Sequence, residues 1–220
     1  MITDEEAARA WVAALPGVDA SAIARLEKLA ALLAEENQLQ NLVSASSLGE
    51  VWRRHIADSA QLLALIPQGA VIESWLDLGT GAGFPGLAVA CLRPDVEVVM
   101  VESRARRIAW LQRAAEALGL TRASILGQRL EHVATRTFDA ISARAFAPLD
   151  KLLALSARFS TSDTIWLLPK GRSAPQELQM LSGWRHVFHV EQSLTDPEAG
   201  IIVGTLAGSV SGAKRKGTVR

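Results

Sequence analysis

Apolar residues recur three or four positions apart along the first third of the chain, as on one face of a helix. The pattern predicts helices over residues 4–14, 21–40 and about 49–65. We therefore expect residues 1–66 to form a helical extension that packs on the rest of the protein as a lid.

From Val71 onward the pattern changes to short apolar runs that alternate with helical stretches. The runs predict strands at residues 75–78, 96–101, 124–126, 138–142, 164–168, 186–190 and 201–206, with helices at 85–92 and 104–118. Such alternation is typical of an α/β fold with a doubly wound, mostly parallel sheet. The close spacing of the last two runs predicts an antiparallel end to a seven-stranded sheet. We expect this core to span residues 67–207 and a flexible basic tail to follow over 208–220.

The composition excludes some classes of protein. Hydrophobic residues make up 49% of the 220 and charged residues 21%, which predicts a packed core rather than global disorder. No apolar run approaches the roughly 18 to 20 residues that span a bilayer. The single cysteine, Cys91, excludes an internal disulfide and fits a reducing compartment. We expect a cytoplasmic monomer with no metal and no membrane attachment.

A glycine-rich segment follows the first predicted strand directly. Residues 77–87 carry the pattern G-x-G-x-x-G at Gly81, Gly83 and Gly86, which is the fingerprint of dinucleotide-binding loops. A strand before the loop and a helix after it are the context of a nucleotide site in a Rossmann-like fold. The pattern alone fits NAD, S-adenosylmethionine or a tight turn without a ligand.

Two details of this segment favour S-adenosylmethionine over NAD. Asp77 stands at the carboxyl end of the strand, two residues before Gly79, where we expect its carboxylate to face the ligand. A negative group suits a ligand that carries an ammonium and a sulfonium, and it repels a pyrophosphate. Pro85 has no N–H to add to a phosphate cradle at the start of the next helix. Glu102 ends the following strand, where a carboxylate hydrogen-bonds the ribose of either cofactor.

The sequence lacks residues that several kinds of methyltransferase require, and this limits which atoms the protein could methylate. Methylation of pyrimidine C5 needs a cysteine nucleophile, and Cys91 lies in an apolar segment where we expect it to be buried. Methylation of exocyclic amines usually relies on a Pro-Pro pair, which is absent, and Lys170 has no acidic partner at the fourth strand for ribose methylation. An acceptor that needs no general base fits best. Guanine N7 is such an acceptor, because its lone pair carries no proton and the enzyme mainly aligns it.

Several segments, taken together, resemble a known family. They are Asn41-Leu42, Arg54-His55-Ile56-Ala57-Asp58-Ser59, Asp77 to Leu87, Glu102-Ser103, Arg129-Leu130-Glu131 and Ala143-Arg144-Ala145-Phe146-Ala147. In this order, over about residues 25–206, the chain resembles the RsmG (GidB) family of bacterial 16S rRNA guanine-N7 methyltransferases. The resemblance implies a Rossmann-like class I methyltransferase fold with S-adenosylmethionine as cofactor. It also implies a substrate, a guanine in the decoding-region loop of 16S rRNA in the small ribosomal subunit.

Two sets of site residues are expected. The cofactor set comprises Asp77, Gly79, Thr80, Gly81, Gly83, Phe84, Glu102, Ser103, Leu130, Glu131 and Arg144. Within it, the resemblance implies that Leu130-Glu131 lies beside the adenine and that Arg144 lies at the mouth shared by cofactor and substrate. The RNA-binding set comprises Arg53, Arg54, His55, Arg104, Arg106, Arg107, Arg144, Lys170 and Arg172.

The basic residues also have a plainer interpretation. The chain has 23 basic and 23 acidic residues, so RNA binding depends on local clusters rather than on net charge. Arg54 and Asp58 have the i,i+4 spacing of a solvated salt bridge. Arginines at 104, 106 and 107 oppose the dipole of the helix that they begin, which favours a phosphate contact. A methyltransferase of small molecules or proteins, an NAD-dependent oxidoreductase and a non-enzymatic RNA-binding module remain alternatives.

Overall fold

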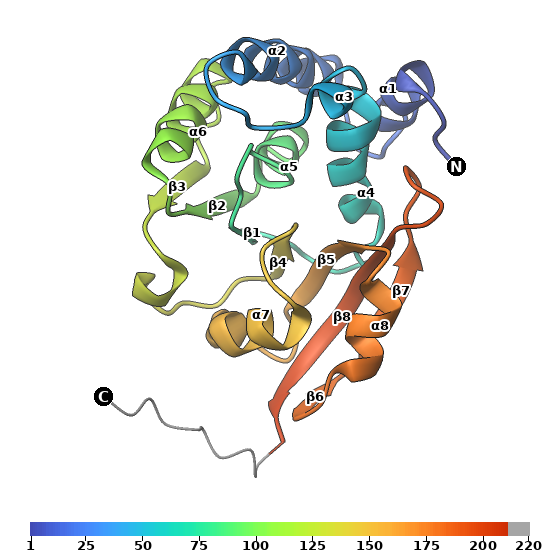
Figure 1. Cartoon of the computed structure of the whole chain (residues 1–220), viewed down its shortest axis with the longest axis vertical. Helices are drawn as coiled ribbons and strands as arrows, with labels where there is room; N and C mark the ends of the chain where they lie inside the picture. Colours follow the sequence, from blue (N-terminus) through green and yellow to red (C-terminus); the bar gives the residue numbers. More distant parts are fainter. Residues whose placement is uncertain (211–220) are drawn as a thin grey trace.

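One sheet of eight strands organises the protein, and the structure, a computed structural model, describes residues 1–210 (Figure 1). The strands are β1 (Ser74–Leu78), β2 (Glu97–Glu102), β3 (Ala123–Gly127), β4 (Ala140–Ala143), β5 (Ile165–Gly171), β6 (Trp184–His186), β7 (His189–Gln192) and β8 (Gly200–Ser209). Strands β3-β2-β1-β4-β5 run parallel in that order, and β8 joins β5 in antiparallel register. The predicted α/β fold with a mostly parallel sheet and an antiparallel end is confirmed.

The strand order reverses between β1 and β4. The chain places β2 and β3 on one side of β1 and then returns to place β4 and β5 on the other. The carboxyl ends of β1 and β4 lie side by side, with Asp77 opposite Ser142 and Leu78 opposite Ala143. Loops diverge at such a switch point, so this edge of the sheet is where a ligand crevice forms.

The antiparallel edge differs from the prediction in one detail. The strand expected over residues 186–190 is two strands, β6 and β7, which both pair with β8, so the sheet has eight strands rather than seven. The interruption falls at Val187-Phe188. This pair of residues lies opposite Gly204 of β8. If Gly204 had a side chain, its Cβ would lie 2.3 Å from the Val187 carbonyl oxygen. A glycine therefore permits the close approach that breaks the ladder.

Helices cover both faces of the sheet (Figure 1). They are α1 (Glu5–Ala13), α2 (Ala20–Asn37), α3 (Ala45–Leu48), α4 (Asp58–Ala64), α5 (Gly86–Leu92), α6 (Ala105–Ala117), α7 (Leu149–Ser156) and α8 (Ala174–Met180), with short 3₁₀ turns at Leu130–His132 and Ala157–Phe159. Helices α1, α2, α4, α5 and α6 share one apolar core with Trp75 and Met100, whereas α7 and α8 pack with Leu76 and Trp166 on the opposite face. Neighbouring strand residues enter different cores because successive side chains point to opposite faces.

The helix expected over residues 49–65 is not one α-helix. It is divided into a π-helical segment at Trp52–Ala57 and α4, with α3 before them. Two oxygens of Glu5 in α1 accept hydrogen bonds from the backbone nitrogens of Trp52 at 2.9 Å and Arg53 at 2.8 Å. Helix α1 therefore fixes the start of the π segment. A π-helix is held by i→i+5 hydrogen bonds in place of the i→i+4 bonds of an α-helix, so the segment departs from the predicted regular helix.

The end of the described chain also departs from expectation. Strand β8 continues to Ser209, so residues 208 and 209 of the expected tail belong to the sheet. Residues 211–220 of that tail lie outside the described part of the chain. Within residues 1–210, no helix is both long enough and apolar enough to cross a membrane.

Candidate active site

Two cavities lie at the carboxyl edge of the parallel strands. The smaller, of about 380 Å³, is lined among others by Gly79, Glu102, Ser103, Leu130 and Glu131. The larger, of about 670 Å³, lies between the π segment, the loop after β4 and the loop between β7 and β8. Residues 145–147 line both cavities. The two spaces therefore meet at this short segment after β4.

The glycine loop between β1 and α5 has a left-handed backbone. Gly79, Gly81 and Gly83 have φ angles of 67°, 61° and 108°, which residues with a side chain rarely adopt. A Cβ on Gly83 would lie 2.5 Å from Cδ1 of Leu87, and a Cβ on Gly79 would lie 2.5 Å from Cδ2 of Phe146. Glycine at these positions lets the chain turn, and it lets α5 and the segment after β4 approach the loop.

The Asp77 carboxylate lies beneath this loop and is fully buried. Its Oδ2 accepts a hydrogen bond from Gly86 N at 3.0 Å, and its Oδ1 accepts one from Ser142 Oγ at 2.8 Å. Burial raises the pKa of Asp77, while the bonds from Ser142 and Gly86 act in the opposite direction. Contact with the ligand stays a prediction for this carboxylate. It lines neither cavity, because its oxygens tie β4 and α5 to the end of β1.

Glu102 lines the smaller cavity and also organises the backbone around it. Its Oε1 accepts hydrogen bonds from Ser103 N at 2.7 Å and Arg104 N at 2.9 Å, and its Oε2 accepts one from Gly81 N at 3.1 Å. These bonds satisfy N–H groups at the start of α6 and attach the glycine loop to β2. A carboxylate offers about four lone-pair sites, so it keeps capacity for a hydroxyl group in the cavity.

The other residues expected to bind cofactor fall into two groups. Gly79, Ser103, Leu130 and Glu131 line the smaller cavity together with Glu102. Thr80, Gly81, Gly83 and Phe84 are buried and line neither cavity. Phe84 is only 2% exposed and stacks on His55, with ring centroids 5.1 Å apart. Phe84 thus supports the wall of the larger cavity through His55, and its contact with the cofactor stays a prediction.

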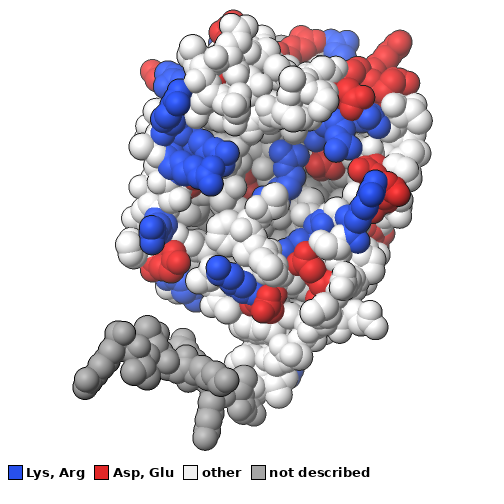
Figure 2. Space-filling view, in the orientation of Figure 1, with Lys and Arg blue, Asp and Glu red and all other residues white. Residues whose placement is uncertain are grey.

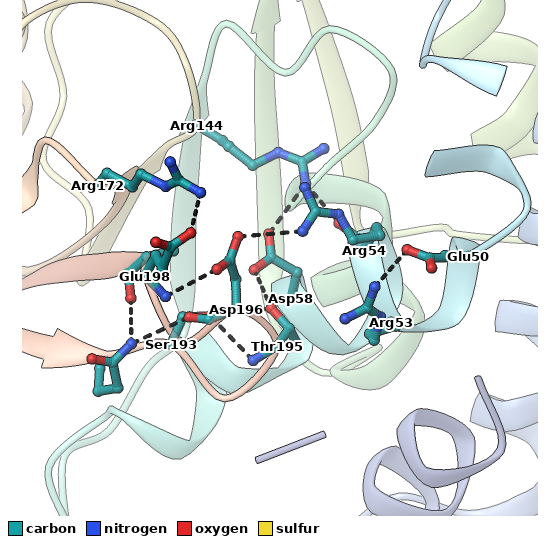
Figure 3. Close-up of polar contacts among 12 residues, drawn as sticks. Glu50, Arg53, Arg54, Asp58, Arg144, Arg172, Ser193, Thr195, Asp196 and Glu198 are labelled. Carbon is teal, nitrogen blue, oxygen red and sulfur yellow. Dashed lines mark hydrogen bonds and ion pairs between the residues drawn. The ribbon is translucent and has the colours of Figure 1, made fainter. Parts of the chain in front are cut away.

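Arg144 connects three elements at that wall (Figure 3). Its Nη1 lies 3.2 Å from Asp58 Oδ2, and its Nη2 lies 3.3 Å from His55 Nδ1. The guanidinium carbon lies 5.6 Å from the centroid of the Phe84 ring. Because arginine only donates hydrogen bonds, Nδ1 of His55 is the acceptor, and the proton of the neutral ring is on Nε2.

The environment of His55 keeps its imidazole neutral. Burial, with the positive charges of Arg144 and Arg54, lowers the pKa of His55 to about 3. Its Nε2 is buried and has no hydrogen-bond partner within residues 1–210. With Nδ1 held by Arg144, the ring offers no free base near neutral pH.

Arg54, which precedes His55, does not pair with Asp58. Its Nη1 lies 3.4 Å from Oδ2 of Asp196 in the loop between β7 and β8 (Figure 3). Asp58 contacts Arg144 instead, and its Oδ1 accepts a hydrogen bond from Thr195 Oγ1 at 2.9 Å. The predicted i,i+4 salt bridge is wrong, because each of the two side chains pairs with a partner distant in sequence.

The arginines predicted to bind RNA do not form one continuous basic surface. Figure 2 shows Lys and Arg interspersed with Asp and Glu over this face. Arg104 and Arg107 line the smaller cavity. Arg53 pairs with an acid at the preceding turn, and Arg106 donates to a backbone carbonyl after α2. Arg172 is exposed and pairs with an acid in the loop between β7 and β8.

Lys170 is held inside the fold. Its side chain is 6% exposed, and its Nζ lies 3.0 Å from Glu177 Oε2 and donates to the Ala147 carbonyl. The same Glu177 oxygen accepts a hydrogen bond from Leu149 N at 2.8 Å. This ion pair anchors the segment after β4. Lys170 also lines the larger cavity, and RNA binding by its ammonium stays a prediction.

Cys91 lies in α5 and is buried, as expected. Burial raises the pKa of this thiol to about 12, so it stays protonated near neutral pH. No group of three or more His, Cys, Asp or Glu side chains placed to hold a metal ion occurs within the described residues.

Comparison with known proteins identifies the family. The family model described as rRNA small subunit methyltransferase G (GidB) matches residues 22–195. A relative from Novosphingobium aromaticivorans, named "Ribosomal RNA small subunit methyltransferase G", is 56% identical over 94% of this chain and 90% of its own length. A protein of the same name from Erythrobacter litoralis is 57% identical over 93% of this chain and 97% of its own length. The chain belongs to the rRNA small subunit methyltransferase G family.

Solved structures show the fold of this family member at low sequence identity. A putative O-methyltransferase from Klebsiella pneumoniae superposes with a TM-score of 0.60 at 13% identity, covering 93% of this chain and 97% of that one. An O-methyltransferase from Bacillus cereus, solved in complex with SAH, gives 0.57 at 14% identity, covering 90% and 97%. At such identities the likeness establishes the fold alone, which is that of the class I methyltransferases.

Three features of this family member were not assigned from sequence. They are Phe146 between the cavities, Glu177 beneath the segment after β4, and Asp196 in the loop between β7 and β8. Phe146 had a usable signal, because it follows β4 at the same edge as the glycine loop. Asp196 had none, since it contacts a residue 142 positions away along the chain.

Proposed function

We propose that this protein transfers a methyl group from S-adenosylmethionine to N7 of a guanine in the decoding-region loop of 16S rRNA. The observation that carries the proposal is the pair of cavities that meet at residues 145–147. One borders the glycine loop and the end of β2, and the other has the volume of a small-molecule site. Family membership supports small-subunit rRNA as the substrate. In this proposal residues 1–66 act as a wall and lid of the larger cavity, and the protein works as a monomer in the cytoplasm.

The residues of the smaller cavity fit S-adenosylmethionine. Glu102 and Glu131 border it among the basic residues Arg104, Arg107, Arg129 and Lys151, and the two carboxylates suit the ammonium and the sulfonium of the ligand. Glu102 would accept hydrogen bonds from the ribose, and Leu130 would offer an apolar surface to the adenine. Asp77 acts indirectly by fixing the loop that carries Gly79. The cofactor, when bound, supplies a methyl group made electrophilic by a positively charged sulfur.

The transfer requires alignment rather than proton removal. Guanine N7 attacks the methyl carbon in line with the sulfur: the N–C bond forms, the S–C bond breaks and the sulfur keeps the electron pair. The positive charge moves to the guanine ring, and no proton is lost. The carboxylates of Asp58, Asp196 and Glu177 border the larger cavity, where each is paired with a basic side chain of the same wall. The neutral state of His55 accords with a reaction that has no general base.

Arginines at the rims of the two cavities would meet the RNA backbone. Arg54 and Arg172 have exposed side chains, and Arg104 is exposed beside the smaller cavity. Contacts from arginine to phosphate fix the position of a nucleic acid without reading its sequence. The ion pairs that Arg54 and Arg172 make with acids of the β7–β8 loop would exchange for phosphates when RNA binds.

Small ribosomal subunits from a strain that lacks the gene provide the test. The subunits are incubated with purified protein and methyl-labelled S-adenosylmethionine, and the 16S rRNA is digested to nucleosides. We expect label in N7-methylguanosine alone. Subunits from the parent strain, whose site is already methylated, are the control and should take up little label. Label in another nucleoside, or in a ribosomal protein, would overturn the proposal.

A further inference from the structure

Phe146 lies where the two cavities meet. Together with its two neighbours it lines both of them. Within residues 1–210, the other aromatic side chain lining the larger cavity is His55. One face of the His55 ring stacks on Phe84, and its Nδ1 is held by Arg144. Phe146 is therefore the aromatic surface that the larger cavity can present to a planar ligand.

The backbone around Phe146 holds its ring in this position. Ala145 has a φ of 51°, a left-handed conformation that is uncommon for a residue with a side chain. On the other side, the Ala147 carbonyl accepts a hydrogen bond from Lys170, which is itself paired with Glu177. The ring lies against Gly79, where an added Cβ would come within 2.5 Å of it. The chain thus places Phe146 between the glycine loop and the larger cavity.

A base must leave its stack before an enzyme can modify it. It then loses the contacts that its two faces made with neighbouring bases. In the wall of the larger cavity, the carboxylates of Asp58 and Glu177 give no stacking surface, and the Arg144 guanidinium is already held by Asp58 and His55 beside the Phe84 ring. We propose that Phe146 stacks on the target guanine and sets the plane in which N7 meets the methyl group. This inference rests on the proposed function and names the residue that receives the base.

Substitutions at Phe146 separate stacking from space filling. Phe146→Leu keeps an apolar side chain of similar bulk but has no aromatic face, whereas Phe146→Tyr keeps the face. Steady-state methylation of small subunits should show a KM for the subunit raised about 5- to 150-fold in Phe146→Leu, which is the range for loss of one base–aromatic stack. Phe146→Tyr should restore a KM close to that of the wild type. Because Phe146 also lines the smaller cavity, the affinity for S-adenosylmethionine, measured by calorimetry, should change by a much smaller factor than the KM in Phe146→Leu.

Phe188→Leu is the matched control, because Phe188 is a buried phenylalanine at the β6–β7 edge, away from both cavities. It should leave the KM for the subunit unchanged. Equal KM values in wild type and Phe146→Leu would overturn the stacking role, and so would a cofactor affinity that falls in parallel with the KM effect. The proposed function fails separately. The wild-type protein could modify another atom while RNA binding, measured by filter retention, still weakens in Phe146→Leu and recovers in Phe146→Tyr. That result would support the stacking role of Phe146 and rule out guanine N7 as the acceptor.

Discussion

Replacing Asp77 by alanine should destabilise the fold, because two buried donors lose their acceptor. Gly86 N and Ser142 Oγ lie 3.0 Å and 2.8 Å from a carboxylate with no exposed surface. Each buried donor left without a partner costs about 1–3 kcal/mol, so the two together cost about 2–6 kcal/mol. Removing the buried charge offsets part of this cost, since burial raises the pKa of Asp77. We therefore expect the free energy of unfolding to fall by about 2 kcal/mol, the lower end of that range.

Urea denaturation measures this loss, and a thermal scan should show a midpoint lower by about 4–8 °C for a chain of this size. Asp77→Asn is the matched variant, since its amide oxygen can accept from Gly86 N while its amide nitrogen donates to Ser142 Oγ. It should cost less than about 1 kcal/mol. Calorimetry should show weaker S-adenosylmethionine binding in Asp77→Ala, whose loop has lost its anchor, and binding close to that of wild type in Asp77→Asn.

Two results would refute this reasoning. Wild-type stability in Asp77→Ala would mean that the two hydrogen bonds beneath the loop contribute nothing to the fold. Wild-type stability in Asp77→Asn, together with lost cofactor binding, would mean that the carboxylate charge itself contacts the ligand.

Three further expectations follow from the same geometry. In Gly79→Ala the new side chain would be held at a left-handed φ of 67° and its Cβ would meet the Phe146 ring. We expect urea denaturation to show a loss of about 1–2 kcal/mol in the free energy of unfolding, and calorimetry to show weaker S-adenosylmethionine binding. Unchanged values for both would contradict this. His55, with its pKa lowered to about 3, binds fewer protons folded than unfolded between pH 3 and 6.5. The free energy of unfolding should therefore decrease as the pH is lowered through that window, by up to about 1.4 kcal/mol per pH unit, and His55→Gln should flatten the dependence measured by urea denaturation at pH 7 and pH 5; equal slopes in the two proteins would refute it. Cys91, with its pKa raised to about 12, should react with a thiol reagent only in denaturant, whereas rapid labelling of the native protein would show that the thiol is exposed.

The order of the strands and of the helices up to α6 was predictable because period and burial are local properties, whereas α7 and α8 were not predicted. Successive residues of β1 and β2 enter the cores on opposite faces of the sheet, so nearly every position in these strands is apolar. These are the apolar runs from which the strands were inferred. The π segment at Trp52–Ala57 was not predictable, since the same apolar stripe suits an α-helix and the departure depends on Glu5 of another helix. The break between β6 and β7 likewise depends on Gly204 across the sheet.

The smaller cavity was predictable in outline from topology. Gly79, Glu102 and Leu130 follow successive parallel strands, whose carboxyl ends share one edge of the sheet. The hydrogen bonds of Asp77 to Gly86 N and Ser142 Oγ were not predictable, because the direction of a side chain at a strand end depends on residues distant in sequence. The larger cavity depends on contacts between residues far apart in sequence, such as Arg54 with Asp196, which no local pattern encodes.

The central claim, a methyl group on guanine N7 in one loop of 16S rRNA, has a direct chemical test. Reduction with borohydride followed by aniline cleaves RNA at N7-methylguanine, and primer extension then locates the break. RNA from gene-deficient subunits treated with the protein and S-adenosylmethionine should give a stop at one guanine of the decoding-region loop, and no stop when the cofactor is omitted. RNA that takes up labelled methyl yet resists cleavage, or that breaks outside this loop, would contradict the account.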